Sequence, residues 1–100
     1  MLSIKTIGIF VAIAGLSAAG AAFGYTGEKL ASQAKLSIDQ AQAIALKARP
    51  GKITDKELEK EKGGLRYSFD VKAHGTVYEV GVDAMTGSVL ENQKEGSHPD

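Results

Sequence analysis

The sequence predicts an α+β fold in which one N-terminal helix packs on a three- to four-stranded antiparallel meander sheet. Three observations support this prediction. A helix-start signature is followed by apolar residues at helical spacing over residues 37–48. Apolar and polar residues then alternate over residues 65–72 and again over residues 76–84, as in half-buried strands. Glycine-containing turns separate these segments, and such short connections make neighbouring strands pair.

The first 24 residues have the features of a signal peptide. Lys5 supplies a positive charge, and the run of 17 residues from 7 to 23 has no charge. Small residues then offer two cleavage sites, before Ala22 and before Tyr25. An uncleaved membrane anchor is the alternative, but this run is at the lower limit for crossing a bilayer. Because its second half is rich in Ala and Gly, we expect cleavage and an exported protein, periplasmic or extracellular. It would contact a membrane only if the segment were retained.

Composition excludes several classes of function. Without the first 24 residues the chain has 11 basic and 12 acidic side chains, and this balance argues against a nucleic-acid partner. The charges over residues 52–62 alternate in sign, which indicates a solvated face. The chain contains no cysteine, so thiol catalysis, redox exchange and thiolate metal sites are excluded. The domain must therefore fold on its hydrophobic core alone.

Residues 25–36 have weak periodicity and are expected to be a linker ahead of a domain at residues 37–93. The helix of that domain begins with a capping box, Ser37 and Gln40. Pro50 and Gly51 end it, because proline disfavours helical geometry at the residue before it. The apolar side of the helix is mostly alanine and consists of Ile38, Ala41, Ile44, Ala45 and Ala48.

Residues 52–62 have two competing interpretations. Thr54 and Glu57 form a second capping-box match, and the Glu/Lys-rich run has helical propensity. Only Ile53 and Leu58 could be buried, and their spacing of five fits neither a helical stripe nor strict alternation. The local sequence alone favours a helix.

The remaining segments predict a meander. Leu65, Tyr67, Phe69 and Val71 form the apolar face of the clearest strand. Residues 73–75 make a hairpin connection to the strand at 76–84, and residues 83–87 make a further turn. A short last strand is expected at residues 88–92, and residues 94–100 are expected to form a disordered polar tail.

Several short stretches within residues 37–91 carry a family resemblance. They include Arg49-Pro50-Gly51-Lys52-Ile53, Tyr67-Ser68-Phe69-Asp70-Val71, Tyr78-Glu79-Val80 and the most specific one, D-A-x-T-G-x-V-L from Asp83 to Leu90. Through them the chain resembles the PepSY family, which occurs in propeptides of thermolysin-like secreted peptidases and in other exported bacterial proteins. The resemblance implies that residues 52–62 form a strand, and we adopt this because an edge strand tolerates a charged face. It also implies inhibition or regulation of peptidases.

Candidate chemistry is sparse. His74 lies in a predicted turn and His98 in the predicted tail, where both are expected to be solvated. His74 could approach Asp70 and Glu79 across the hairpin, but no metal-ligand motif accompanies them. No nucleophile–base signature or cofactor loop is present. The sequence therefore predicts no enzyme, no catalytic or metal site and no cofactor.

The remaining candidates for function are surfaces. The predicted partner-binding residues lie on the charged edge strand and on the polar faces of the next two strands, and they are Glu57, Glu59, Arg66, Asp70 and Glu79. An open strand edge can accept an extended peptide. We therefore expect an exported protein-binding module whose partner is a secreted or envelope peptidase or another exported protein. The alternative is an exported protein that binds a small ligand or a metal.

Overall fold

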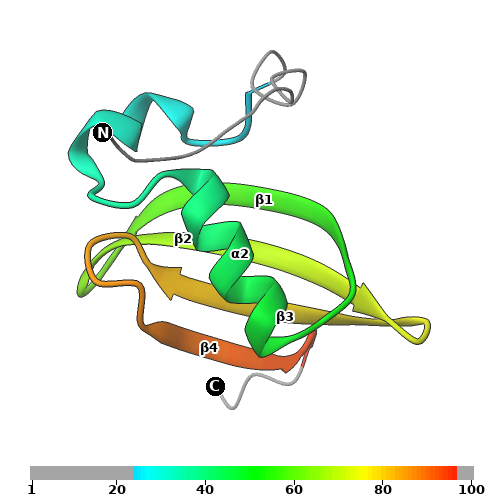
Figure 1. Cartoon of the computed structure of the whole chain (residues 1–100). Coiled ribbons are helices and arrows are strands. Elements are labelled where there is room, and N and C mark those ends of the chain that lie inside the picture. The colour runs from blue at the N-terminus through cyan, green and yellow to red at the C-terminus, as the bar shows by residue number, and fades with distance from the viewer. Residues whose placement is uncertain (1–23, 97–100) are drawn as a thin grey trace, which may run out of the picture.

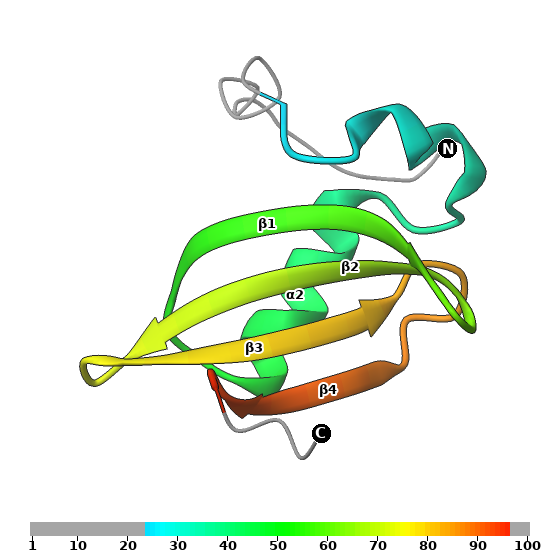
Figure 2. The same cartoon turned by 180° about the vertical axis from the view of Figure 1, so that it is seen from behind.

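The computed structural model describes residues 24–96, so residues 1–23 of the predicted signal peptide and residues 97–100 lie outside it. Its elements are η1 (Glu28–Gln33), α2 (Ile38–Ala48), β1 (Lys52–Glu61), β2 (Gly64–Ala73), β3 (Thr76–Asp83) and β4 (Val89–Lys94). The four strands form one antiparallel sheet in the order β1-β2-β3-β4. Helix α2 crosses one face of the sheet (Figure 1), and no described element covers the opposite face, which we call the open face (Figure 2). The predicted α+β meander is confirmed, with four strands.

Helix α2 begins and ends where the sequence predicts. The Ser37 hydroxyl accepts a hydrogen bond from the Gln40 amide at 3.1 Å, and the Gln40 side chain accepts one from the Ser37 amide at 2.8 Å. At the other end Arg49 adopts an extended conformation. Its guanidinium lies 3.8 Å from the centre of the Tyr78 ring, and its Nε donates to Asn92 Oδ1 at 3.0 Å. The end of the helix is therefore attached to β3 and β4.

The hydrophobic core lies between α2 and the sheet. Ala41 and Ala45 have no exposed surface, so their small side chains let the helix approach the strands closely. The Tyr67 hydroxyl donates to the Leu36 carbonyl at 2.7 Å, which satisfies the polar atom of this buried ring. The strands and the turn after β3 contribute the other buried apolar residues: Leu58, Leu65, Tyr67, Phe69, Val71, Val80, Val82 and Ala84.

Strand β1 settles the ambiguity over residues 52–62. It is a strand along its whole length, with Leu58 opposite Tyr67 and Ile53 opposite Val71. The register shifts by one residue between Ile53 and Asp55, so a bulge at Thr54 inserts an extra residue. Because of that bulge, an odd spacing of five places Ile53 and Leu58 on the same face. The bulge therefore explains the spacing of five, which fits neither a helical stripe nor strict alternation.

Residues 25–36, which we expected to be a linker, contact the domain at both ends. Thr26 forms a parallel bridge with β1, and its carbonyl accepts a hydrogen bond from the Leu58 amide at 2.9 Å. The amides of Lys35 and Leu36 both donate to the Ala84 carbonyl, at 3.1 and 3.0 Å. These contacts attach the segment to the domain, and they place the backbone of Thr26 against the outer edge of β1.

The last strand differs from its prediction. It runs from Val89 to Lys94, whereas the sequence predicted residues 88–92, so residues 93 and 94 extend a strand expected to end before them. The register with β3 shifts between Gly81 and Val82, opposite the start of β4. Val89 and Leu90 do not enter the core, and 44% and 51% of their surface is exposed.

Candidate functional site

The alternating charges of β1 are sorted by the strand onto two faces. Because successive side chains of a strand point to opposite sides, the neighbours of buried Leu58 project away from the helix. The acidic residues of β1 therefore share the open face, and they are Asp55, Glu57, Glu59 and Glu61. Lys56 and Lys60 lie on the helix side, where Lys56 Nζ is 3.4 Å from Gln42 Oε1. From Asp55 to Glu61 the run is thus a strand with an acidic open side and basic residues on the helix side.

All five predicted partner-binding residues come together on the open face. Glu59 is opposite Arg66 across β1 and β2, and Asp70 is opposite Glu79 across β2 and β3. They line one shallow cavity of about 370 Å³ together with Glu57. Three further polar residues, which were not among the predicted partner-binding residues, line the same cavity: Glu61, Ser68 and Glu91. Glu91 was missed because its position depends on the bulged register of β4.

Arg66 is held inside a polar network at one end of the open face. Its Nη2 donates to Glu91 Oε1 at 2.7 Å, and its Nε donates to Ser68 Oγ at 3.2 Å and lies 3.8 Å from Glu59 Oε2. A Cβ at Gly81 would come within 1.8 Å of Nη2, so the glycine leaves the space that the guanidinium occupies. Although burial acts in the opposite direction, the hydrogen bond and charge of Arg66 hold the pKa of Glu91 below its usual value.

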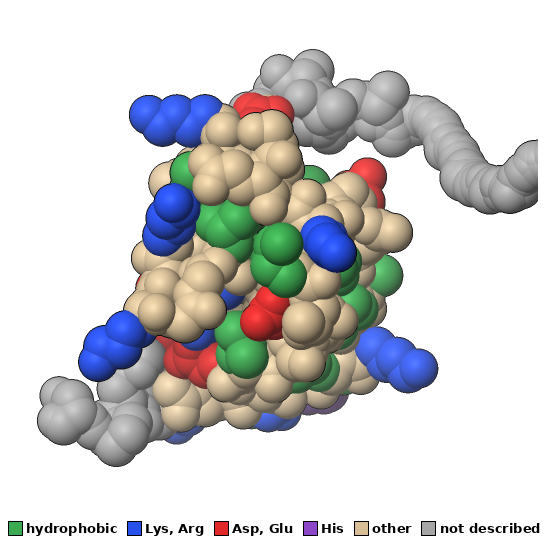
Figure 3. All heavy atoms as spheres, turned by 90° about the vertical axis from the view of Figure 1, so that its left-hand side faces the viewer, with side chains coloured by type: hydrophobic (Ala, Val, Ile, Leu, Met, Phe, Trp, Pro, Cys, Tyr) green, Lys and Arg blue, Asp and Glu red, His purple; other side chains and the backbone are tan. Residues whose placement is uncertain are grey.

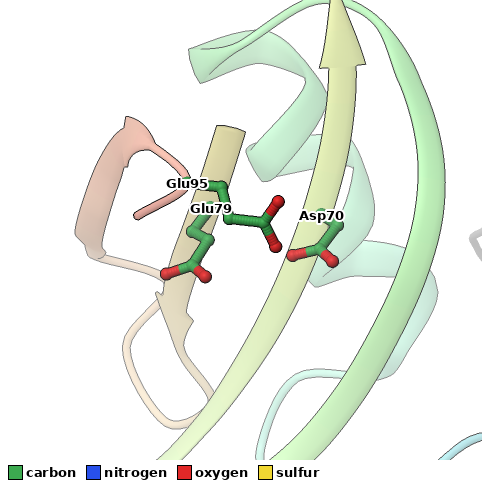
Figure 4. Close-up of side chains that lie close together, drawn as sticks. All are labelled: Asp70, Glu79 and Glu95. Carbon is green, nitrogen blue, oxygen red and sulfur yellow. The ribbon is translucent and has the colours of Figure 1, made fainter. Parts of the chain in front are cut away.

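Three carboxylates gather at the other end of the open face. Oxygens of Asp70, Glu79 and Glu95 lie within 4.8 Å of one another, and the side chains converge between neighbouring strands (Figure 4). Burial raises the pKa of Asp70, and the charges of Glu95 and Asp55 raise it further. Exposed acidic groups are common on protein surfaces, and these carboxylates alone do not assign a metal. His74, which we considered beside Asp70 and Glu79, is exposed in the β2–β3 turn.

The repulsion between Asp70 and its neighbouring carboxylates predicts a pH dependence of stability. The raised pKa of Asp70 means that the folded state holds the proton more tightly than the unfolded state does. Its ionisation therefore destabilises the fold as pH rises from about 4, the ordinary value for a carboxyl, through the folded pKa. Asp70→Asn should increase the free energy of unfolding more at pH 7 than at pH 4, measured by urea unfolding. Glu28→Gln, on η1 and outside the open face, should not reproduce this difference. A smaller gain at pH 7 than at pH 4 would contradict the prediction.

The outer edge of β1 is only partly open. In an antiparallel strand the backbone N–H and C=O groups of successive residues point to opposite sides of the strand. The Leu58 amide points away from β2 and donates to Thr26, so the backbone groups of Glu57 and Glu59 point toward β2. A second cavity of about 460 Å³ lies beside this edge and is lined by residues that include Gly24, Gln42 and Ile53. Thr26 thus occupies the centre of the edge that we expected to accept an extended peptide. No described element covers the open face.

The most specific sequence pattern, from Asp83 to Leu90, has a structural role. Asp83 Oδ1 accepts hydrogen bonds from the amides of Met85 and Thr86 at 2.8 and 3.0 Å, and these bonds lower the pKa of the Asp83 carboxyl. Gly87 takes a φ of 84°, in the left-handed region. The turn lies at the end of the molecule shown in Figure 3, where hydrophobic side chains are visible among basic and acidic ones. The pattern therefore builds a turn.

Comparisons with known proteins agree with this architecture. The family described as "Peptidase propeptide and YPEB domain", PepSY, matches residues 35–92, which is more than half of the chain. No curated protein and no solved structure matches the chain. Among the helices of residues 24–96, none is long and apolar enough to cross a membrane.

Proposed function

The chain belongs to the PepSY family, and from this premise we propose that it is an exported, non-enzymatic module that binds and regulates a secreted or envelope peptidase. The observation that carries this proposal is the family match across the whole helix and most of the sheet. The export step would use residues 1–24 as a signal peptide, cleaved before Ala22 or Tyr25. Intact-mass analysis of the exported protein tests that step, and a mass that retains Met1 would contradict it.

The binding surface of the proposal is the open face. It is a largely polar surface on one side of four paired strands, and Glu57, Glu59, Arg66, Asp70 and Glu79 meet on it. Strands of up to 10 residues in a four-stranded sheet give a face of about 600 Å². This is at the low end of the area that one partner contributes to a stable complex, since such complexes usually bury about 1,200–2,000 Å² in total. We therefore expect reversible binding, with an association rate that falls as salt is added, since charges on such a surface mainly steer encounter.

Peptidase inhibition tests this function directly. The purified protein should slow a secreted peptidase of the cells that produce it, measured as the loss of cleavage of a chromogenic peptide. Glu57→Lys should weaken the inhibition about tenfold, because it reverses a charge on the open face. Lys60→Glu is the matched control: it lies on the same strand but on the helix side, and it should retain inhibition. Equal loss from both variants, or no effect of the protein on any such peptidase, would count against the proposal.

The alternative function is binding of a small ligand or a metal ion. It would replace the proposed one if inhibition were absent and a titration with metal ions or small ligands shifted the amide resonances of the open face at micromolar concentration. Both measurements use the same purified chain, so they discriminate between the two functions without further variants.

A further inference from the structure

We propose that the open face recognises an extended, basic segment of the partner, with its arginine or lysine side chains seated among the carboxylates around Asp70 and Glu79. This proposal rests on the proposed function, because it names the chemistry of the partner that the open face would bind. It is carried by three observations: a separation of charge across the sheet, the guanidinium site that the fold already contains, and the crowding of carboxylates beside it.

The first observation is the excess of acid on the open face. Although the whole chain has a formal net charge of zero, strand alternation places eight acidic residues on this face against three basic ones. The acidic residues are Asp55, Glu57, Glu59, Glu61, Asp70, Glu79, Glu91 and Glu95, and the basic residues are Lys52, Arg66 and Lys72. This count leaves out Asp83, whose carboxylate accepts hydrogen bonds within the β3–β4 turn. A surface of one sign attracts and orients partners of the other sign.

The second observation is that the fold itself binds a guanidinium on this face. Arg66 lies over Gly81 and is held by Glu91, Ser68 and Glu59 through its donors. Guanidinium groups match carboxylates because their donors form a planar fork. The Arg66 end of the face therefore shows, within this chain, how a cationic side chain is accommodated between carboxylates of neighbouring strands.

The third observation is the crowding at the other end. The carboxylates of Asp70, Glu79 and Glu95 are held within 4.8 Å of one another. Burial raises the pKa of Glu57, and the charges of Glu59, Asp55 and Asp70 add to the rise. A cation placed among these groups would relieve their repulsion. The repulsion among the carboxylates would be lower in the complex than in the free protein, and this difference in free energy favours binding.

The geometry of the sheet fits an extended peptide. Side chains on one face of a strand recur about every 6.6–6.8 Å, and neighbouring strands are about 4.8 Å apart, so the carboxylates form a regular grid. An extended peptide has the same repeat, so every second side chain can point at the face. The cavity of about 370 Å³ gives room for such side chains among the residues that project from the open face. A basic residue at alternate positions is thus the pattern that this face selects.

The test is a titration of the full chain with a synthetic peptide, Arg-Ser-Arg-Ser-Arg-Ser, followed by amide chemical shifts at low salt. We expect the largest shifts around Glu57, Asp70 and Glu79 and weaker binding as salt is added. A peptide with Glu in place of Arg should cause no shifts. The double variant Glu57→Gln and Glu79→Gln should bind the basic peptide at least about tenfold more weakly, since it removes two of the carboxylates that receive the cation.

A matched control separates recognition from general charge attraction. The double variant Glu28→Gln and Asp39→Asn loses the same two charges, from η1 and α2, and should bind within about twofold of the original chain. Equal weakening in both double variants, or shifts centred on α2, would overturn the proposal. Should the open-face double variant not fold, Glu95→Gln, at the exposed residue that follows β4, should still weaken binding more than either control substitution does.

Two further outcomes are informative. Calcium alone, saturating the carboxylates of Asp70, Glu79 and Glu95 at micromolar concentration and blocking the peptide, would assign the face to a metal ion and overturn the proposal. The experiment needs no natural partner, so its failure is distinct from failure of the proposed function. A peptidase inhibited through another surface, with no peptide binding here, would leave the regulatory function standing and remove only this inference.

Discussion

Replacing Tyr67 with alanine is expected to remove most of the stability of the domain. The ring has no exposed surface, and its centroid lies 6.4 Å from that of Phe69 at the centre of the core. Truncating a buried aromatic residue to alanine costs about 3–5 kcal/mol. The free energy of unfolding of a small domain is itself about 5 kcal/mol. Urea unfolding followed by circular dichroism should show that the Tyr67→Ala protein retains about 0–2 kcal/mol and begins to unfold at the lowest urea concentrations.

Tyr67→Phe separates the ring from its hydroxyl. This variant keeps the packing and removes the hydrogen bond shared with the Tyr25 side chain as well as the one donated to the Leu36 carbonyl, at 2.7 Å. The expected loss is about 1–2 kcal/mol, since one hydrogen bond usually contributes about 1 kcal/mol net. Burial raises the pKa of Tyr67 to about 12, so the bond to Leu36 should persist well above neutral pH. Losses of similar size in the two variants would show that the hydroxyl, not the ring, matters most.

Replacing Gly27 with alanine is expected to detach residues 24–33 from the sheet. Gly27 has a φ of 86°, and a Cβ there would lie 1.8 Å from the Leu58 carbonyl oxygen. The left-handed conformation alone costs about 1–2 kcal/mol for a residue with a side chain. The clash adds to this cost, and because the neighbour is backbone it cannot be relieved by a side-chain rotation. The Leu58 amide, which donates to Thr26, should then exchange with solvent at least about tenfold faster.

Gly63→Ala is the control for this substitution. A Cβ at Gly63 would meet no atom within 4 Å, so the exchange of the Leu58 amide should be unchanged. If Gly27→Ala left that amide equally protected, the segment would not depend on the contact at Gly27. If it unfolded the whole domain, the segment would be an integral part of the core.

The fold was predictable where its signals are local. Ser37 and Gln40 specify the start of α2 through bonds between residues three apart, and alternation specifies β2 and β3. β1 was ambiguous because Glu and Lys favour helices in isolation, whereas its conformation is set by pairing with β2. The docking of Thr26 on Leu58 could not be predicted, because neither residue carries a local pattern that indicates the other.

The candidate site was partly predictable for the same reason. Period-two alternation suffices to place Glu57, Asp70 and Glu79 on one face once the strands are known. The positions of Glu91 and Glu95 depend on where the bulge in β4 lies, and a bulge shifts every later side chain to the other face. The balanced composition concealed the acidic face, since summed charge carries no information on which side of a strand each residue lies.

The carbonyl of Ala84 has a consequence for the order of folding. It accepts the amides of Lys35 and Leu36, and these residues are about half the chain away in sequence. Contacts at such separation form late, after local hairpins have reduced the entropy lost on closing the intervening loop. The β2–β3 hairpin, closed by His74 and Gly75, is the natural early structure. A chain that is synthesised N-terminus first would therefore leave the amides of Lys35 and Leu36 without this partner until residue 84 has emerged.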